Sequence, residues 1–137
     1  MANPDDFLYE YSVVRYVPHV AREEFLNIGL LMMCKRQKWL KGKIELNEDR
    51  LKALDPGVDI KKLKHWSSIF GRDDIPFKDI PAEEKYRWLS AVKSAVIQTS
   101  PSHPGLVIVS EPEMERGEKI KTLEKEFDRL FKELVTV

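Results

Sequence analysis

Four polar residues near the start of the chain have side chains suited to binding a charged ligand: Arg15, Arg22, Glu24 and Asn27. An arginine presents a planar fork of donors that fits a carboxylate or a phosphate, and an asparagine offers both a donor and an acceptor. We take these four as candidate binding residues and, if they line one pocket, as residues of a small enzyme. The alternative is structural: Arg22 and Glu24 would form a surface ion pair, and Asn27 would satisfy a backbone turn.

A second candidate is the run from position 35 to position 43, which contains five basic residues, one tryptophan and no acid. Basic side chains contact phosphates and an aromatic ring stacks on bases, so a hairpin of this composition suits nucleic acid. The alternative is a hairpin whose lysines discourage edge-to-edge association of strands. The residues concerned are Lys35, Arg36, Lys38, Trp39, Lys41 and Lys43.

Other catalytic chemistries have little support in the sequence. The histidines lie far apart without metal-ligand spacing, and the single cysteine, Cys34, cannot build a zinc site. Ser100, Ser102 and His103 stand among prolines, whereas a serine nucleophile usually occupies a strained Gly-x-Ser-x-Gly turn. The sequence has no phosphate-binding glycine loop and no dinucleotide fingerprint. We therefore predict no metal and no cofactor, and no motif argues for an enzyme.

The composition is that of an ordinary globular domain, with 137 residues of which 42% are hydrophobic and 34% charged, so we expect one domain over residues 1–137. Basic and acidic residues both number 23, so the chain lacks the basic excess that is usual in dedicated nucleic-acid-binding domains. The single cysteine, the polar N-terminal segment and the lack of an apolar stretch of ~20 residues predict a cytoplasmic protein without a membrane segment.

The elements that must position these residues begin with three strands. Residues 7–17 and 25–34 are rich in aromatic, β-branched and aliphatic types, and residues 38–46 place apolar side chains on one face and much of the charge on the other. The second strand is apolar at nearly every position, which predicts burial on both faces, and Gly29 within it predicts a bulge or a close backbone approach. Because the links are short, we expect an antiparallel meander.

The rest of the chain is mainly helical. Capping residues and stop signals predict helices at about 47–54, at 59–70 and from position 81 onward. Residues 118–135 carry the clearest apolar stripe and predict a C-terminal amphipathic helix. With the meander, these elements predict an α+β fold of three N-terminal strands, one or two short later strands, and three to four helices.

The segment after the third helix has two interpretations. Helical periodicity from position 81 continues to Val96, but residues 96–99 fit a short strand equally well. Residues 100–105 are predicted to form a loop because they contain two prolines and a glycine. The apolar residues 106–109 are a further strand candidate.

Separate blocks of sequence follow one another along the chain in a recognisable order. A tyrosine-led strand with an arginine and a proline precedes an Arg-x-Glu-Phe-x-Asn-x-Gly segment, which enters an apolar strand. The blocks are Tyr11-Ser-Val-Val-Arg-Tyr-Val-Pro18, Arg22-Glu-Glu-Phe-Leu-Asn-Ile-Gly-Leu-Leu31, Arg50-Leu-Lys-Ala-Leu-Asp-Pro56, Arg87-Trp-Leu89 and Ser94-Ala-Val-Ile-Gln-Thr-Ser-Pro-Ser-His-Pro-Gly-Leu106. In these blocks, over roughly residues 9–134, the chain resembles the bacterial family catalogued as domain of unknown function 3037.

The resemblance implies a protein partner, and it implies no particular catalytic activity. Members of that family often have a proline where this chain has Val92, which favours a helix that ends there and a strand at 94–99. Members also tend to be encoded beside a protein similar to the HipA-type kinases, which implies a HipA-like kinase as partner. We therefore expect a small accessory or protein-interaction module. The alternatives are a nucleic-acid-binding protein that uses the 35–43 hairpin and a small enzyme with a pocket around Arg15, Arg22, Glu24 and Asn27.

Overall fold

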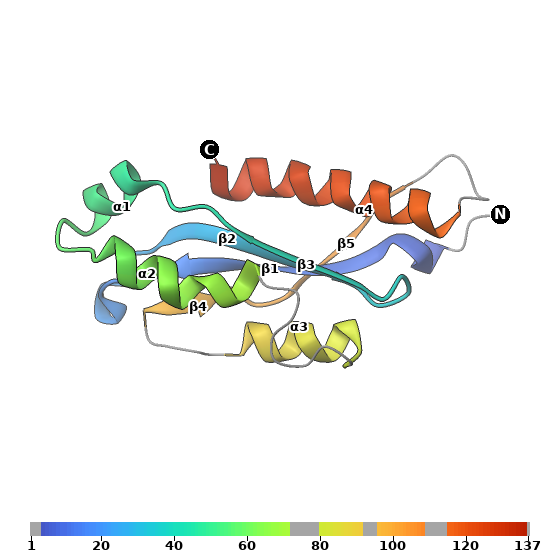
Figure 1. Ribbon diagram of the computed structural model, residues 1–137, viewed down its shortest axis with the longest axis horizontal. Coiled ribbons are helices and arrows are strands. Elements are labelled where there is room, and N and C mark those ends of the chain that lie inside the picture. Colours follow the sequence, from blue (N-terminus) through green and yellow to red (C-terminus); the bar gives the residue numbers. More distant parts are fainter. Residues whose placement is uncertain (1–3, 72–79, 92–95, 109–114, 137) are drawn as a thin grey trace.

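The structure, a computed structural model, describes residues 4–71, 80–91, 96–108 and 115–136 (Figure 1). Its strands are β1 (Leu8–Tyr16), β2 (Leu26–Cys34), β3 (Trp39–Ile44), β4 (Ile97–Thr99) and β5 (His103–Leu106). The helices of the described ranges are α1 (Glu48–Leu54), α2 (Ile60–Ser67), α3 (Ala82–Ser90) and α4 (Arg116–Phe131). Short 3₁₀ turns η1 (Pro4–Phe7), η2 (Val20–Arg22) and η3 (Ser68–Gly71) and a π-helical turn η4 (Lys132–Thr136) connect or extend them.

The strands form one antiparallel sheet in the order β3-β2-β1-β4, and β5 pairs with the other half of β1. β1 is therefore the central strand: β2 lies along one of its sides, and β4 and β5 share the other. The predicted meander of β1, β2 and β3 is confirmed, and so is the α+β fold with a C-terminal helix.

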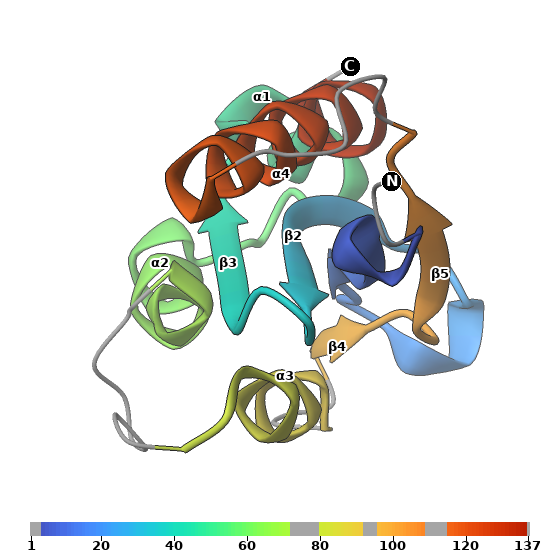
Figure 2. The ribbon, with the colours of Figure 1, turned by 90° about the vertical axis from the view of Figure 1, so that its right-hand side faces the viewer.

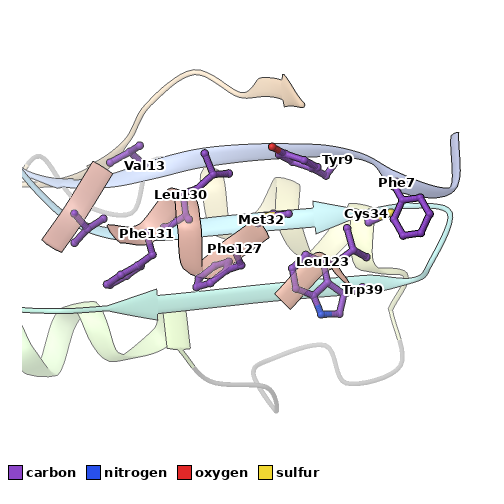
Figure 3. Close-up of a cluster of buried hydrophobic side chains, with 12 residues drawn as sticks. Phe7, Tyr9, Val13, Met32, Cys34, Trp39, Leu123, Phe127, Leu130 and Phe131 are labelled. Atoms are coloured by element: carbon purple, nitrogen blue, oxygen red, sulfur yellow. The ribbon is translucent and has the colours of Figure 1, made fainter. Parts of the chain in front are cut away.

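Each face of the sheet is buried by helices, as Figure 2 shows with α4 on one side and α3 on the other. Val13 belongs to the core under α4, whereas its neighbour Val14 belongs to the core under α1, α2 and α3. Successive side chains of β1 therefore point to opposite faces, as is usual along a strand. β2 is buried on both faces from Ile28 to Cys34, as predicted. Figure 3 shows the first core, in which the aromatic and aliphatic side chains of α4 pack on β1, β2 and β3.

A β-bulge in β2 sets the register at one end of the sheet. Val14 pairs with Gly29, but Arg15 pairs with Asn27, so Ile28 is the extra residue. A Cβ atom on Gly29 would lie 2.3 Å from Ile44 Cδ1 and 2.6 Å from the carbonyl oxygen of Lys43. The glycine is therefore required by the close approach of β3, and both predictions made for it are confirmed.

The sequence interpretation of residues 100–109 was partly wrong. The strand lies at His103–Leu106, within and just after the expected loop, and Val109 is outside the described residues. A proline is tolerated here because Pro104 faces Glu10 in a pair that makes no ladder hydrogen bonds, so its missing N–H would point away from β1. The predicted strand at 94–99 is confirmed over Ile97–Thr99, and its first residues lie outside the described ranges.

A hydrogen bond of Tyr16 links the central strand β1 to the end of helix α1. Its Oη donates to Asp55 Oδ2 over 2.7 Å, at the C-cap of α1. Burial, with the hydrogen bond to Asp55, raises the pKa of Tyr16 to about 12. A phenol whose pKa is raised in the folded state contributes stability that is complete below its unfolded pKa of about 10 and is lost as the pH rises through the folded pKa.

We therefore expect Tyr16→Phe to lower the free energy of unfolding at neutral pH by about 1–3 kcal/mol, since a hydrogen bond to a charged acceptor is lost. The advantage of the wild type over Tyr16→Phe should shrink between about pH 10 and about pH 12. Urea denaturation at a series of pH values measures both quantities. A wild-type advantage that stays constant across this alkaline range would contradict the assignment.

Candidate functional site

The structure brings two of the four candidate binding residues together. Arg15 and Asn27 lie directly opposite each other on β1 and β2, just past the bulge. Asn27 Nδ2 donates to the carbonyl oxygen of Leu134 over 3.0 Å, which places the pair on the face covered by α4 and η4. Because Nδ2 is committed to this carbonyl, the orientation of the amide is fixed and Oδ1 is the free acceptor.

Two buried polar atoms at this site have no hydrogen-bond partner within the described part of the chain. They are Arg15 Nε, a donor, and Asn27 Oδ1, an acceptor. Arg15 Cζ lies 4.2 Å from the ring centroid of Phe25, which gives the guanidinium a cation–π contact. Phe25 itself is 45% exposed. The site therefore combines a positive charge, a free donor, a free acceptor and an accessible aromatic ring.

The other two candidates pair with each other at the surface. Arg22 Nε lies 2.9 Å from Glu24 Oε1, and the two side chains are 68% and 49% exposed. Glu23 between them adopts a left-handed conformation with a φ of 55°, which closes the η2 turn through its N–H to Val20. An exposed pair of this kind contributes about 0–1 kcal/mol, and a role for it in ligand binding stays a prediction.

The basic residues of the hairpin between β2 and β3 are largely matched by acids or aromatic rings. Arg36 Nε lies 3.4 Å from Asp6 Oδ1 and Lys35 Nζ lies 4.0 Å from Glu83 Oε1, while Lys38, with a φ of 51°, occupies the tip. These contacts leave less positive charge free for a phosphate backbone, and nucleic-acid binding by this hairpin stays a prediction.

The tryptophan of the hairpin points into the core under α4. Trp39 is 8% exposed, and its Nε1 donates to Glu124 Oε1 over 3.4 Å. Lys41 forms an ion pair with Glu124, and Lys43 Nζ lies 4.5 Å from the ring centroid of Phe131. The face of β3 that the sequence describes as charged is therefore covered by α4, and the lysines cap its aromatic side chains.

The serine, histidine and cysteine side chains that could take part in nucleophilic catalysis lie in contact with other residues of the fold. Ser100 Oγ accepts from the N–H of Val13 over 2.9 Å, while Ser102 Oγ lies 2.8 Å from Tyr86 Oη. The ring of His103 packs on Tyr11 at a centroid distance of 5.3 Å. Burial raises the pKa of the Cys34 thiol, which lowers the fraction of reactive thiolate.

An open hollow of about 570 Å³ lies between the outer side of β3 and α2. Its lining mixes the charged residues Lys43, Lys64 and Glu48 with apolar and small residues. It exists because η3 packs against the edge of β3, a tertiary contact without a signal in the sequence. Within the described ranges, no three His, Cys, Asp or Glu side chains are placed to hold a metal ion. No helix among the same residues has the length and apolar character needed to cross a membrane.

The edge formed by β5 was not identified from the sequence as a functional surface. Val107 N donates to the carbonyl oxygen of Phe7 over 3.2 Å, so the next pair, Leu8 with Leu106, makes no ladder hydrogen bonds. The N–H and C=O of Leu106 therefore point away from β1. Three large apolar side chains are exposed along this edge: Leu8 at 48%, Leu106 at 47% and Ile108 at 89%. The signal in the sequence was the apolar stretch after Gly105, which was interpreted only as a strand candidate.

Comparison with known proteins gives one family match. A family model described as "Protein of unknown function (DUF3037)" matches residues 11–135, nearly the whole chain. No curated protein and no solved structure matches the chain. The match confirms the resemblance found in the sequence blocks.

Proposed function

We propose that this chain, which belongs to the DUF3037 family, is a small accessory module that binds a protein partner by strand addition along β5. The observation that supports this proposal is the edge at Leu106, which no α-helix of the described residues covers and where outward-pointing backbone groups stand beside exposed apolar side chains. An extended segment that adds to such an edge gains main-chain hydrogen bonds, and the side chains beside it provide specificity.

The two edges of the sheet differ in how they are protected. The edge at β3 is covered by η3, whose Phe70 carbonyl approaches Gly42 so closely that no Cβ would fit. Figure 2 shows α2 beyond β3, whereas α1, α2, α3 and α4 all lie on the inner side of β5 at the other edge. Proteins usually blunt an exposed edge with charges, prolines or a covering element. Pro104 blunts only the first half of β5, and the second half presents apolar side chains that are typical of a binding surface.

An extended segment of another protein fits this edge better than a second copy of the chain. A stable dimer usually buries about 800 Å² on each subunit, which is more than a row of three side chains can supply. Because Pro104 lacks an N–H, a continuous ladder can form only from Leu106 onward, which suits a short apolar segment. The family resemblance suggests a HipA-like kinase as the first partner to test.

The experiment is a calorimetric titration of the purified chain with a HipA-like kinase of the kind that members of the family tend to be encoded beside. We expect micromolar binding that weakens at least about tenfold in Leu106→Lys, because a lysine on the edge opposes strand addition. Val20→Lys is the matched control, since Val20 is an equally exposed apolar residue, at 53%, in η2 away from β5. Its affinity should stay at the wild-type value.

Three outcomes would contradict the proposal. The first is the absence of binding at micromolar concentration, and the second is an equal loss of affinity in Leu106→Lys and Val20→Lys. The third is self-association of the wild-type chain that Leu106→Lys abolishes, measured by sedimentation, because a second copy would then occupy the edge.

A further inference from the structure

The pair formed by Arg15 and Asn27 stands at the other end of β1 from Leu8, and its chemistry is independent of the β5 edge. Arg15 carries a permanent positive charge, yet no carboxylate lies within ion-pair distance of it in the described part of the chain. Leaving a buried donor unsatisfied costs about 1–3 kcal/mol, and more when the group is charged. In native structures, such a buried donor is often satisfied by a hydrogen bond to a bound ligand or to an ordered water.

The acceptor Asn27 Oδ1, beside Arg15, restricts which chemical groups the ligand can contain. Opposite residues of an antiparallel pair have Cβ atoms about 4.5–5.5 Å apart, so one small group can reach both side chains. Arg15 Nε and Asn27 Oδ1 are not bonded to each other, and a group between them must accept a hydrogen bond from the first and donate one to the second. A phosphate dianion accepts but does not donate, so it would leave Oδ1 unsatisfied.

We infer that Arg15 and Asn27 form a binding site for the C-terminal carboxylate of a peptide. At a peptide C-terminus, the carboxylate accepts from the guanidinium while the N–H of the last residue donates to Asn27 Oδ1. Phe25, which stacks under the guanidinium and is 45% exposed, holds the fork of Arg15 in place and offers an apolar surface for the last side chain. An apolar C-terminal residue is therefore preferred.

Charges around the site are compatible with an incoming carboxylate. Arg50 Nη1 donates to the carbonyl oxygen of Val135 over 3.2 Å, which places a second cation beside η4. Glu45, whose N–H donates to the carbonyl oxygen of Ile28 beside Asn27, accepts a hydrogen bond at Oε2 from the hydroxyl of Thr136 over 3.0 Å. The pair of Arg22 and Glu24 in the preceding turn is neutral as a unit.

The test uses the full isotopically labelled chain and the acetylated dipeptide Ac-Gly-Val, followed by nuclear magnetic resonance. We expect saturable shifts of the Arg15 Nε–H and Asn27 side-chain amide resonances. The same peptide with an amidated C-terminus should bind at least about tenfold more weakly, because the anionic acceptor is gone. Arg15→Met should lose binding by a similar factor, whereas Arg87→Met removes an equal charge from an exposed position of α3 and should bind as the wild type does.

Arg15→Lys is a second variant in case Arg15→Met fails to fold, because it keeps a cation but lacks the planar fork, and it should also bind at least about fivefold more weakly. The inference is overturned by the absence of saturable shifts, which would mean that water alone satisfies the pair. Equal responses to the acid and the amide, or tighter binding of inorganic phosphate than of Ac-Gly-Val, would overturn it as well. None of these results bears on the β5 edge, so the two proposals fail separately.

Discussion

Replacing Phe127 with alanine should lower the free energy of unfolding by about 3–5 kcal/mol, the usual cost of truncating a buried phenylalanine. Phe127 has no exposed surface and lies in the middle of the apolar stripe of α4. Its ring stacks on Phe131 at a centroid distance of 6.0 Å (Figure 3), and Lys41 Nζ of β3 lies 4.9 Å from its centroid. The substitution therefore removes dispersion contacts, a ring pair and a cation–π contact together, and it leaves a cavity against the sheet.

Urea denaturation followed by circular dichroism measures this loss. The matched control is Lys125→Ala, which changes an exposed residue of the same helix and should alter the free energy of unfolding by no more than about 0.5 kcal/mol. A cost below about 1.5 kcal/mol for Phe127→Ala would mean that α4 does not pack on this face as described.

The packing of α4 also determines the state of the candidate peptide site. α4 continues into η4, and the Leu134 carbonyl of that turn fixes the amide of Asn27. If the helix shifts on the sheet, Asn27 loses the bond that orients Oδ1. Core packing and ligand binding are therefore linked through a single hydrogen bond, and a variant that loosens α4 should also broaden the side-chain resonance of Asn27.

The elements with a regular apolar pattern were predictable because periodicity is a local property of the sequence. The alternating faces of β1, the double burial of β2 and the amphipathic α4 each follow from the spacing of apolar residues within one segment. The place of Trp39 was not predictable in the same way. The other residues on its face of β3 are Lys41 and Lys43, and their contacts with Glu124 and Phe131 allow that face of the strand to be covered.

The residue types of the candidate site could be chosen from the sequence, but their pairing could not. Without the bulge, Gly29 opposite Val14 would place Ile28 opposite Arg15, and Asn27 would project from the other face of the sheet. The extra residue at Ile28 restores Asn27 to the side of Arg15. Gly29 signalled a bulge or a close backbone approach, yet the register of β1 against β2 is a tertiary property that the local sequence does not specify.

The edge at β5 was missed for a different reason. A proline and a glycine in the segment His103–Leu106 are typical of loops, and they predict a loop when the segment is considered alone. The segment becomes a strand because β1 offers unpaired backbone groups beyond β4, and because Pro104 falls at a position that needs no N–H. Pairing of this kind is decided by tertiary structure, and propensity does not override it.

Replacing Gly42 with alanine should destabilise the protein by about 1–3 kcal/mol, although it adds a single methyl group. A Cβ atom at this position would lie 1.8 Å from the carbonyl oxygen of Phe70 and 2.8 Å from Leu31 Cδ2. The first of these is backbone of η3, which cannot rotate away, so η3 must separate from β3. Since η3 covers this edge of the sheet, the variant should also expose β3 and raise the tendency to aggregate.

The same change at Gly117 provides the control, because nothing lies within 4 Å of a Cβ atom built there and the residue stands in the first turn of α4. Gly117→Ala should stabilise the protein by up to about 1 kcal/mol, as alanine loses less backbone entropy in a helix. Thermal unfolding of the two variants should therefore move in opposite directions from the wild type. If Gly42→Ala unfolds at the wild-type temperature, η3 does not pack on β3. The edge of the sheet at β3 would then be as open as the edge at β5, and the contrast between the two edges would be wrong.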